Sequence, residues 1–324
     1  MSQYSEKYTK RNERERVPET LSRLVSELIN IESVNDIYDP CCGAGELLLS
    51  LQNHCNSIYG EEVDRNLWAY AKLQFALKKE DATHLRNTSC IREPAFTEST
   101  GLVKQFDVVV SCPQYAHHSW GYEDIIDDQY NRFVYGNPPK STGDYGYISH
   151  MLASTKPGSG MALVILPQGV LYRGAKEALL REQLIRENVL DTVIVLPEKL
   201  LSGTLQPLVV LVFKYSKKDK NVLFIDASHS YTASKMLNTI ESVHIEQITH
   251  AYQSRQSINK YSRLVPFNEI EANNFNCNIP RYIDTSELIQ PMPLVDLDNK
   301  RKALLKELAD VDLIISAQLD SVLK

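Results

Sequence analysis

The N-terminal part of the chain alternates between helical and strand-like spacing of its apolar positions. Residues 18–30 carry apolar side chains at every third or fourth position, which predicts an amphipathic helix. The pattern then predicts, in order, a strand at 36–39, a glycine-bearing turn at 40–45, a helix at 46–51, a strand at 57–60 and a helix at about 66–79. This order is typical of the nucleotide-binding half of a doubly wound sheet.

The middle of the chain keeps this alternation. Residues 116–145 are polar, aromatic and too irregular to assign, and His150-Met151-Leu152 is expected to belong to a helix on the sheet. Apolar runs predict strands at 106–110, 161–167, 192–196, 208–214 and 222–226, and a helical period predicts a helix at about 175–188. Repeated strands and helices indicate an α/β fold with a mainly parallel sheet.

The same pattern divides the chain into four parts. We expect a loose N-terminus at 1–16, an α/β domain at 17–230, an irregular segment at 231–293 and a last helix within 294–324, at about 296–323. The helix carries a heptad seam with two polar exceptions, Arg301 and Gln318; its apolar members are Leu297, Leu304, Leu308, Val311, Ile315 and Val322. This seam predicts docking of a protein partner; the alternative is packing on the core of its own chain.

Composition narrows the classes of partner and site. The net charge is −6, so any DNA contact needs a local surface or a basic partner. The six cysteines form no Cys-x-x-Cys pair and no histidine spacing completes a zinc site, so no metal is expected and reduced thiols are the default. No signal peptide or membrane span is evident, and a soluble cytoplasmic protein is expected.

The turn Asp39-Pro40-Cys41-Cys42-Gly43-Ala44-Gly45 is the most informative motif. Its glycines let a ligand approach the backbone, and the next helix offers free N–H groups. An acidic residue after the second strand suits a ribose diol: Glu62 is the first choice and Asp64 the second. A third glycine is lacking, so this is not the dinucleotide fingerprint. The alternative is an ordinary glycine turn in an unrelated α/β protein.

The motif resembles the S-adenosylmethionine loop of the modification (M) subunits of type I restriction–modification systems, which methylate adenine N6 in DNA. Three collinear blocks, at 135–140, 166–174 and 278–282, resemble the same family. The resemblance covers about 18–324, without the helical domain that normally precedes the catalytic domain. It implies a class I S-adenosylmethionine-dependent methyltransferase fold, Rossmann-like with a mainly parallel seven-stranded sheet and a C-terminal helical extension.

The same resemblance implies S-adenosylmethionine as the cofactor, with no metal. Asp39 would hold the methionine amino group and Glu62 the ribose. The other implied cofactor residues are Pro40, Cys42, Gly43, Gly45 and Glu93, the last at the cofactor adenine. It also implies a specificity (S) subunit as the partner that reads DNA.

The catalytic motif departs from the family. Members carry Asn-Pro-Pro-Phe or Asn-Pro-Pro-Tyr, whose Asn oxygen and backbone carbonyl accept the two hydrogens of the adenine amine while the ring stacks on the flipped base. The collinear residues are Cys112, Pro113, Gln114 and Tyr115. A thiol is a weak acceptor, so Gln114 could substitute for the amide, Pro113 keeps a carbonyl and Tyr115 keeps the ring.

Other positions also depart from the family. The family's aromatic-x-Thr-Pro segment reads Glu15-Arg16-Val17-Pro18, the glycine after the loop is Glu46, and its Gly-Asp is matched to Arg92-Glu93. These changes leave two hypotheses: an adenine-N6 methyltransferase subunit, or an inactive pseudo-methyltransferase that serves as a binding or scaffolding module. A release-factor-type glutamine methyltransferase is disfavoured by the collinear blocks.

Two nearby features invite other interpretations. Asn137-Pro138-Pro139 resembles the missing motif, but it follows no buried strand and is interpreted as structural or DNA-proximal. Cys112 could suggest a cytosine-type nucleophile, but a small residue filling the pocket is favoured. His117, His118 and Trp120 could contact DNA, and an exposed aromatic loop is the favoured interpretation.

Overall fold

The computed structural model describes residues 16–29, 34–78, 84–113, 120–202, 205–285 and 294–322. The chain divides into two units, Met1–Asp284 and Thr285–Lys324, and each is described by itself. The loose N-terminus expected at 1–16 lies almost entirely outside the described residues.

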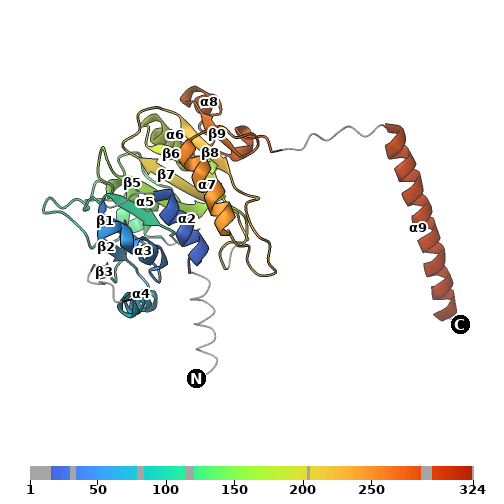
Figure 1. The fold of residues 1–324 in the computed structure, drawn as a ribbon, viewed down its shortest axis with the longest axis horizontal. Coiled ribbons are helices and arrows are strands. Elements are labelled where there is room, and N and C mark those ends of the chain that lie inside the picture. Colours follow the sequence, from blue (N-terminus) through green and yellow to red (C-terminus); the bar gives the residue numbers. More distant parts are fainter. Residues whose placement is uncertain are drawn as a thin grey trace, which may run out of the picture. The chain divides into compact units, whose positions relative to one another are not determined.

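The first unit is built on one mixed nine-stranded sheet with the order β3-β2-β1-β4-β5-β7-β6-β8-β9 (Figure 1). Its strands are β1 (Val34–Asp39), β2 (Cys55–Glu61), β3 (Leu85–Arg86), β4 (Val108–Ser111), β5 (Met161–Pro167), β6 (Leu190–Val195), β7 (Leu208–Lys214), β8 (Val222–Asp226) and β9 (Ser262–Val265). The seven strands from β3 to β6 in this order have the arrangement of a class I methyltransferase sheet, and β8 and β9 extend the sheet beyond β6.

Strand direction follows from the connections. The strands β3, β2, β1, β4 and β5 are all parallel to their neighbours, as expected for strands joined through crossovers. Strand β7 is antiparallel to both β5 and β6, between which it lies. Because β7 follows β6 without an intervening helix, the chain can reverse and pair β7 directly with β6. The spacing of apolar residues does not indicate strand direction, so the sequence pattern could not predict this reversal.

Helices cover the sheet on both faces, and the alternation of side chains along the strands creates two separate cores. Ile37 faces one core and its neighbour Tyr38 faces the other, and Val109 faces away from Val108 and Val110. The first core packs against α2 (Glu19–Ile29), α3 (Glu46–Leu51), α4 (Arg65–Leu77) and α7 (Ser242–Ser254); the second packs against α5 (Asp144–Ala153), α6 (Lys176–Arg186) and α8 (Phe267–Ala272). The result is a three-layer α/β/α unit.

The predicted helices and strands between residues 18 and 226 are confirmed, with ends that shift by a few residues at most. The helix expected around His150 is α5, whose His150 and Met151 are buried. One expectation is wrong. The segment 231–293, expected to be irregular, contains α7, β9 and α8, and β9 pairs with β8. Short elements with mixed polar faces gave too weak a period to be recognised.

The second unit contains the helix α9 (Leu294–Val322), close to the bounds predicted for the last helix. Along its described side chains, the apolar residues of the seam are exposed to solvent. None of the helices in the described residues combines the length and apolar character that a membrane crossing requires.

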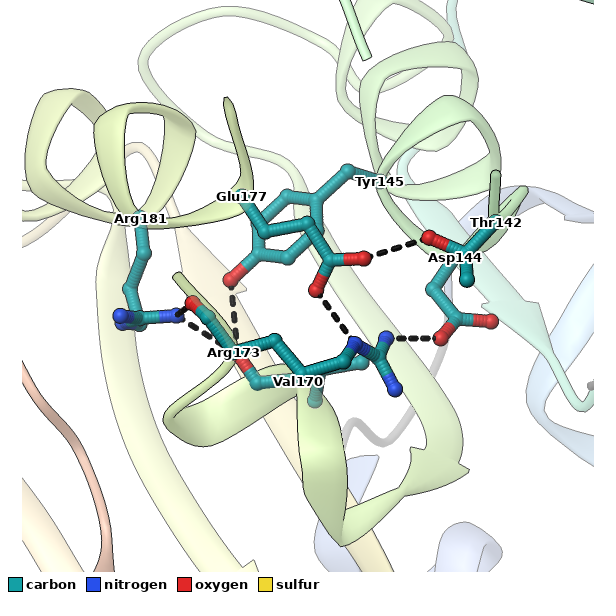
Figure 2. A network of polar contacts seen from close by, with 7 residues as sticks. All are labelled: Thr142, Asp144, Tyr145, Val170, Arg173, Glu177 and Arg181. Atoms are coloured by element: carbon teal, nitrogen blue, oxygen red, sulfur yellow. Dashed lines mark hydrogen bonds and ion pairs between the residues drawn. The ribbon is translucent and has the colours of Figure 1, made fainter. Parts of the chain in front are cut away.

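A buried ionic network fixes the start of α5 to the start of α6. Figure 2 shows the guanidinium of Arg173 between two carboxylates, those of Asp144 and Glu177. The Thr142 hydroxyl also donates to Glu177. Both carboxylates are buried, and burial raises the pKa of Asp144 although the Arg173 charge beside it acts in the opposite direction. Arg173 is therefore the cation that makes two buried acids tolerable.

We predict that Arg173→Ala lowers the free energy of unfolding by roughly 2–4 kcal/mol, because it leaves two buried carboxylates without their cation. Urea denaturation measures this change. Arg186→Ala is the matched control: Arg186 also pairs with a glutamate one helical turn away, Glu182, but on an exposed surface. Its loss should change the free energy of unfolding by less than about 1 kcal/mol. Equal effects of the two substitutions would contradict the prediction.

Candidate functional site

The carboxyl ends of the neighbouring strands β2, β1 and β4 open into one pocket. Residues that follow each strand line it, which is where open α/β sheets bind ligands. Its lining consists of Val17, Asp39, Pro40, Cys41, Cys42, Gly43, Glu46, Leu47, Glu62, Val63, Leu67, Thr88, Ser89, Cys90, Cys112 and Tyr147. Five of the seven predicted cofactor residues, namely Asp39, Pro40, Cys42, Gly43 and Glu62, are among them.

The two glycines of the turn serve different purposes. Gly43 has a φ of 55°, and a Cβ atom placed on it would meet no protein atom within 4 Å, so this position opens into the pocket. Gly45 has a φ of 88°, and its Cβ would lie 3.2 Å from Cε2 of Phe75 in α4. Gly45 is not among the described residues that line the pocket. It lets the turn pack closely against α4, so its role is structural.

Glu62 points toward the glycine turn. Its Oε2 accepts a hydrogen bond from the Gly43 N–H at 3.0 Å, and its Oε1 accepts one from the Asp64 N–H at 2.7 Å. The second candidate, Asp64, instead caps α4, because its side chain accepts from the N–H groups of Asn66 and Leu67. Glu62 thus combines two tasks: it holds the turn in shape and presents a carboxylate to the pocket.

Asp39 lies deeper, at the end of β1. It is 1% exposed, and its Oδ1 accepts from the Cys41 N–H at 2.9 Å and from the Ser111 hydroxyl at 2.8 Å. Burial raises the pKa of this carboxyl to about 7, although both hydrogen bonds act to lower it. Ser111 was not singled out in the sequence, since a serine that ends a buried strand carries no recognisable signal.

A second buried polar chain lies beneath the pocket. The Tyr38 hydroxyl donates to Glu61 at 2.8 Å and lies 3.0 Å from Nε2 of His150. On the other side, Arg132 donates to the carbonyl of Cys90, which lines the pocket. Burial raises the pKa of Glu61 to about 7 and lowers that of His150 well below its usual value. These groups form a buried hydrogen-bonded network that reaches the pocket wall at Cys90.

Glu93, the residue expected at the cofactor adenine, is exposed and is not among the described residues that line the pocket. The wall after β3 consists instead of Thr88, Ser89 and Cys90. The Thr88 hydroxyl donates to the backbone carbonyl of Glu93, so the two positions are linked only through the loop. Arg92-Glu93 was matched to the family's Gly-Asp over two residues only, which is too short a pattern to identify the residues that line this wall.

The predicted catalytic positions are only partly within the described residues. Cys112 directly follows β4 and lines the pocket, and Pro113 next to it is buried. Gln114 and Tyr115 lie outside the described residues, as do His117 and His118.

Trp120 is not part of an exposed aromatic loop, which corrects the favoured interpretation. It is 3% exposed, and its indole N–H donates to the carbonyl of Lys140. Its ring lies against Gly146, where a Cβ would come within 2.4 Å of Cζ3. Asn137, in the second Asn-Pro-Pro sequence, is exposed and does not line the pocket.

Glu46, which replaces the family's glycine after the loop, forms an ion pair with the segment before α2. Nε of Arg16 lies 2.7 Å from Oε1 of Glu46, so the segment before α2 is tied to the first turn of α3. Val17 and Glu46 both line the pocket. The ion pair therefore holds two segments together at the edge of the pocket.

Comparisons with known proteins agree with this geometry. A family model described as N-6 DNA Methylase matches residues 1–290. The chain is 26% identical to the type I restriction enzyme MjaVII methylase subunit of Methanocaldococcus jannaschii, over 90% of this chain and 54% of that protein. It is 25% identical to the type I restriction enzyme HindI methylase subunit of Haemophilus influenzae, over 95% of this chain and 72% of that protein. The chain thus spans about half the length of the first of these relatives.

Solved structures give the same result. The type I restriction–modification methyltransferase subunit of Streptococcus thermophilus superposes with a TM-score of 0.74 at 30% identity, over 83% of this chain and 59% of that chain. The EcoKI M protein superposes with a TM-score of 0.64 at 14% identity, over 92% of this chain and 72% of that chain, a likeness that concerns the fold.

The buried acids predict a pH dependence of stability. The pKa of Asp39 is raised from 3.8 to about 7, so the folded protein favours the protonated carboxyl. The stabilisation of the folded state that this gives is complete below about pH 4 and is lost as the pH rises through 7. Asp39→Asn keeps an acceptor oxygen for Cys41 and Ser111 and removes the ionisation. Between about pH 4 and pH 8, wild-type protein should lose roughly 2–4 kcal/mol of unfolding free energy relative to this variant.

Urea denaturation at a series of pH values measures this difference. Asp219→Asn, a change of an exposed turn carboxylate, serves as the control and should run parallel to wild type. Parallel curves for wild type and Asp39→Asn would show that Asp39 does not titrate in this range.

Proposed function

The chain belongs to the N-6 DNA methylase family, and from that premise we propose that it is the S-adenosylmethionine-dependent, adenine-N6-specific methyltransferase subunit of a restriction–modification complex. The observation that carries the proposal is the pocket shared by Gly43, Glu62 and Cys112 at the carboxyl ends of β1, β2 and β4. It contains the candidate methyl-donor loop and Cys112, the first residue of the candidate target-base motif.

The lining suits the charge and shape of S-adenosylmethionine. The open space at Gly43 is a cradle that a Cβ would fill, and Asp39 and Glu62 supply the negative charge that an ammonium and a sulfonium favour. When bound, the cofactor supplies an activated methyl group. Asp39 would hold the methionine amino group, and Glu62 would accept hydrogen bonds from the ribose hydroxyls while still fixing the turn.

The target amine requires two acceptors before its lone pair can react. We assign them to the backbone carbonyl of Pro113 and the side-chain oxygen of Gln114, with Tyr115 stacking on the flipped base. Cys112, at the position of the family's Asn, lines the pocket but offers only a weak acceptor. The proposed reaction is therefore slower than in an enzyme with the complete motif.

The thiol of Cys112 also favours a second candidate function. In this alternative the chain binds the cofactor or a partner but transfers no methyl group, and acts as a pseudo-methyltransferase module. The two functions share the pocket and differ in the acceptors available to the base.

Recognition of DNA is assigned to a partner. The net charge of −6 gives no general attraction for DNA, and the relatives are named as methylase subunits of type I restriction enzymes. We propose that a specificity-type subunit supplies the DNA target and docks on the exposed seam of α9, at residues 294–324.

Binding of the cofactor is tested by substitution of Gly43. Gly43→Ala should weaken binding of S-adenosylmethionine in calorimetry by more than about tenfold, because the added Cβ enters the space meant for ligand. Gly158→Ala is the matched control: Gly158 also has a positive φ, 76°, and open space around its Cβ, but it lies outside the pocket. Both variants carry about 1 kcal/mol of backbone strain. Equal affinities in the two variants would contradict the proposed pocket.

Methyl transfer is tested with labelled cofactor, target DNA and the cognate specificity subunit. Wild-type protein should transfer slowly, and Cys112→Asn with Gln114→Pro should raise the rate by roughly 10²-fold, since it restores a strong acceptor in the family's arrangement. Tyr115→Ala should remove the activity, whereas Tyr172→Ala, on the exposed surface, should not. Cofactor binding without transfer by wild type would favour the pseudo-methyltransferase.

A further inference from the structure

The helix α9 exposes a long apolar stripe that its own unit does not cover. Leu304 and Leu308 are each 57% exposed, and Val311 and Ile315 are each 49% exposed. In proteins most helical stability comes from packing of an apolar face, so burial of this stripe against another helix would stabilise α9. The stripe is therefore a candidate contact surface, and the order of residues along it indicates one partner.

The seam of α9 is symmetric about the point between Ala309 and Asp310. When the helix is laid against a reversed copy of itself about that point, Leu308 meets Val311, and Leu304 meets Ile315. The two polar exceptions coincide in the same way, because Arg301 then lies opposite Gln318. Every apolar layer faces an apolar layer, and the donor guanidinium faces an amide oxygen that can accept from it.

We propose that α9 pairs with α9 of a second copy of this chain as an antiparallel two-stranded coiled coil in this register. The assignment goes beyond the methyltransferase function, and it names the occupant of the seam in the isolated chain. A specificity-type subunit would compete with the second copy for the same surface.

A parallel pair is disfavoured by like charges. It would place Arg301 against Arg301 of the other copy in the seam, and Glu307 beside Asp312 of the other copy on the flank. In the antiparallel pair, Glu307 faces Ile314 and Asp312 faces Leu305, so no like charges meet at these flanking positions. Charge thus selects the orientation.

The polar layer also selects the register. A shift of one heptad in the antiparallel pair would bring Arg301 against Val311, and a shift the other way would bring Gln318 against Leu308. Either shift buries a polar group against an aliphatic side chain. A single polar layer that is satisfied only in one alignment is the usual way in which a coiled coil fixes its register.

Sedimentation equilibrium of the full chain tests the pairing. Wild-type protein should form a dimer, and Leu308→Asp should weaken it by roughly a hundredfold, because a carboxylate enters the central layer. Leu313→Asp is the matched control: Leu313 is also an exposed leucine of α9, at 69%, but it lies outside the seam. It should leave the dimer intact. A monomeric wild type, or a dimer indifferent to Leu308→Asp, would overturn the proposal.

Substitutions at Gln318 test the orientation. In the antiparallel pair, Gln318→Glu places a carboxylate opposite Arg301 and should tighten the dimer about tenfold, whereas Gln318→Lys should loosen it by a similar factor. In a parallel pair both changes set like charges against each other and both would loosen the dimer, which would overturn the proposed arrangement.

A specificity-type subunit separates this inference from the proposed function. Dissociation of the wild-type dimer on addition of that subunit, with loss of both interactions in Leu308→Asp, supports a shared seam. A chain that stays monomeric alone yet binds the subunit and methylates DNA would refute self-pairing and leave the methyltransferase proposal standing.

Discussion

The pocket depends on backbone N–H groups held by buried carboxylates. Glu62 accepts a hydrogen bond from the N–H of Gly43, and Asp39 accepts one from the N–H of Cys41, so residues at two strand ends hold the same turn. Ser111 adds a third strand by donating to Asp39. Because these three side chains come from the ends of β2, β1 and β4, the turn keeps its shape only when the three strands are aligned, and the site forms together with the sheet.

Much of this arrangement could be predicted from the sequence. The turn at 39–45, the acidic residue after β2 and the strand before Cys112 each have a strong local pattern, and parallel strands bring their carboxyl ends to one edge. Ser111 and Thr88 could not be found in this way. Ser111 is placed by its bond to Asp39 at the end of the neighbouring strand, and Thr88 lies in the loop after β3, which has no recognisable pattern. The segment of α7 and β9 was missed because long-range pairing, here with β8, decides its structure.

Glu46, which stands where the family carries a glycine, is tied into the fold by an ion pair. Its partner Arg16 comes from the segment before α2, so a contact between two segments beside the pocket accommodates the change at this position. Cys112 replaces the family's amide with a thiol, a much weaker acceptor, so the catalytic motif is the departure that bears most on the chemistry.

The position of β7 bears on how the chain acquires this site during synthesis. Strand β7 fills the space between β5 and β6, yet it follows both of them in the sequence. While the chain emerges from the ribosome, β1 to β5 can assemble with the ligand-binding edge already in place, whereas β6 has no neighbour until residue 214 has been added. Translation pausing before that point would leave one edge of β5 and both edges of β6 available to other nascent chains.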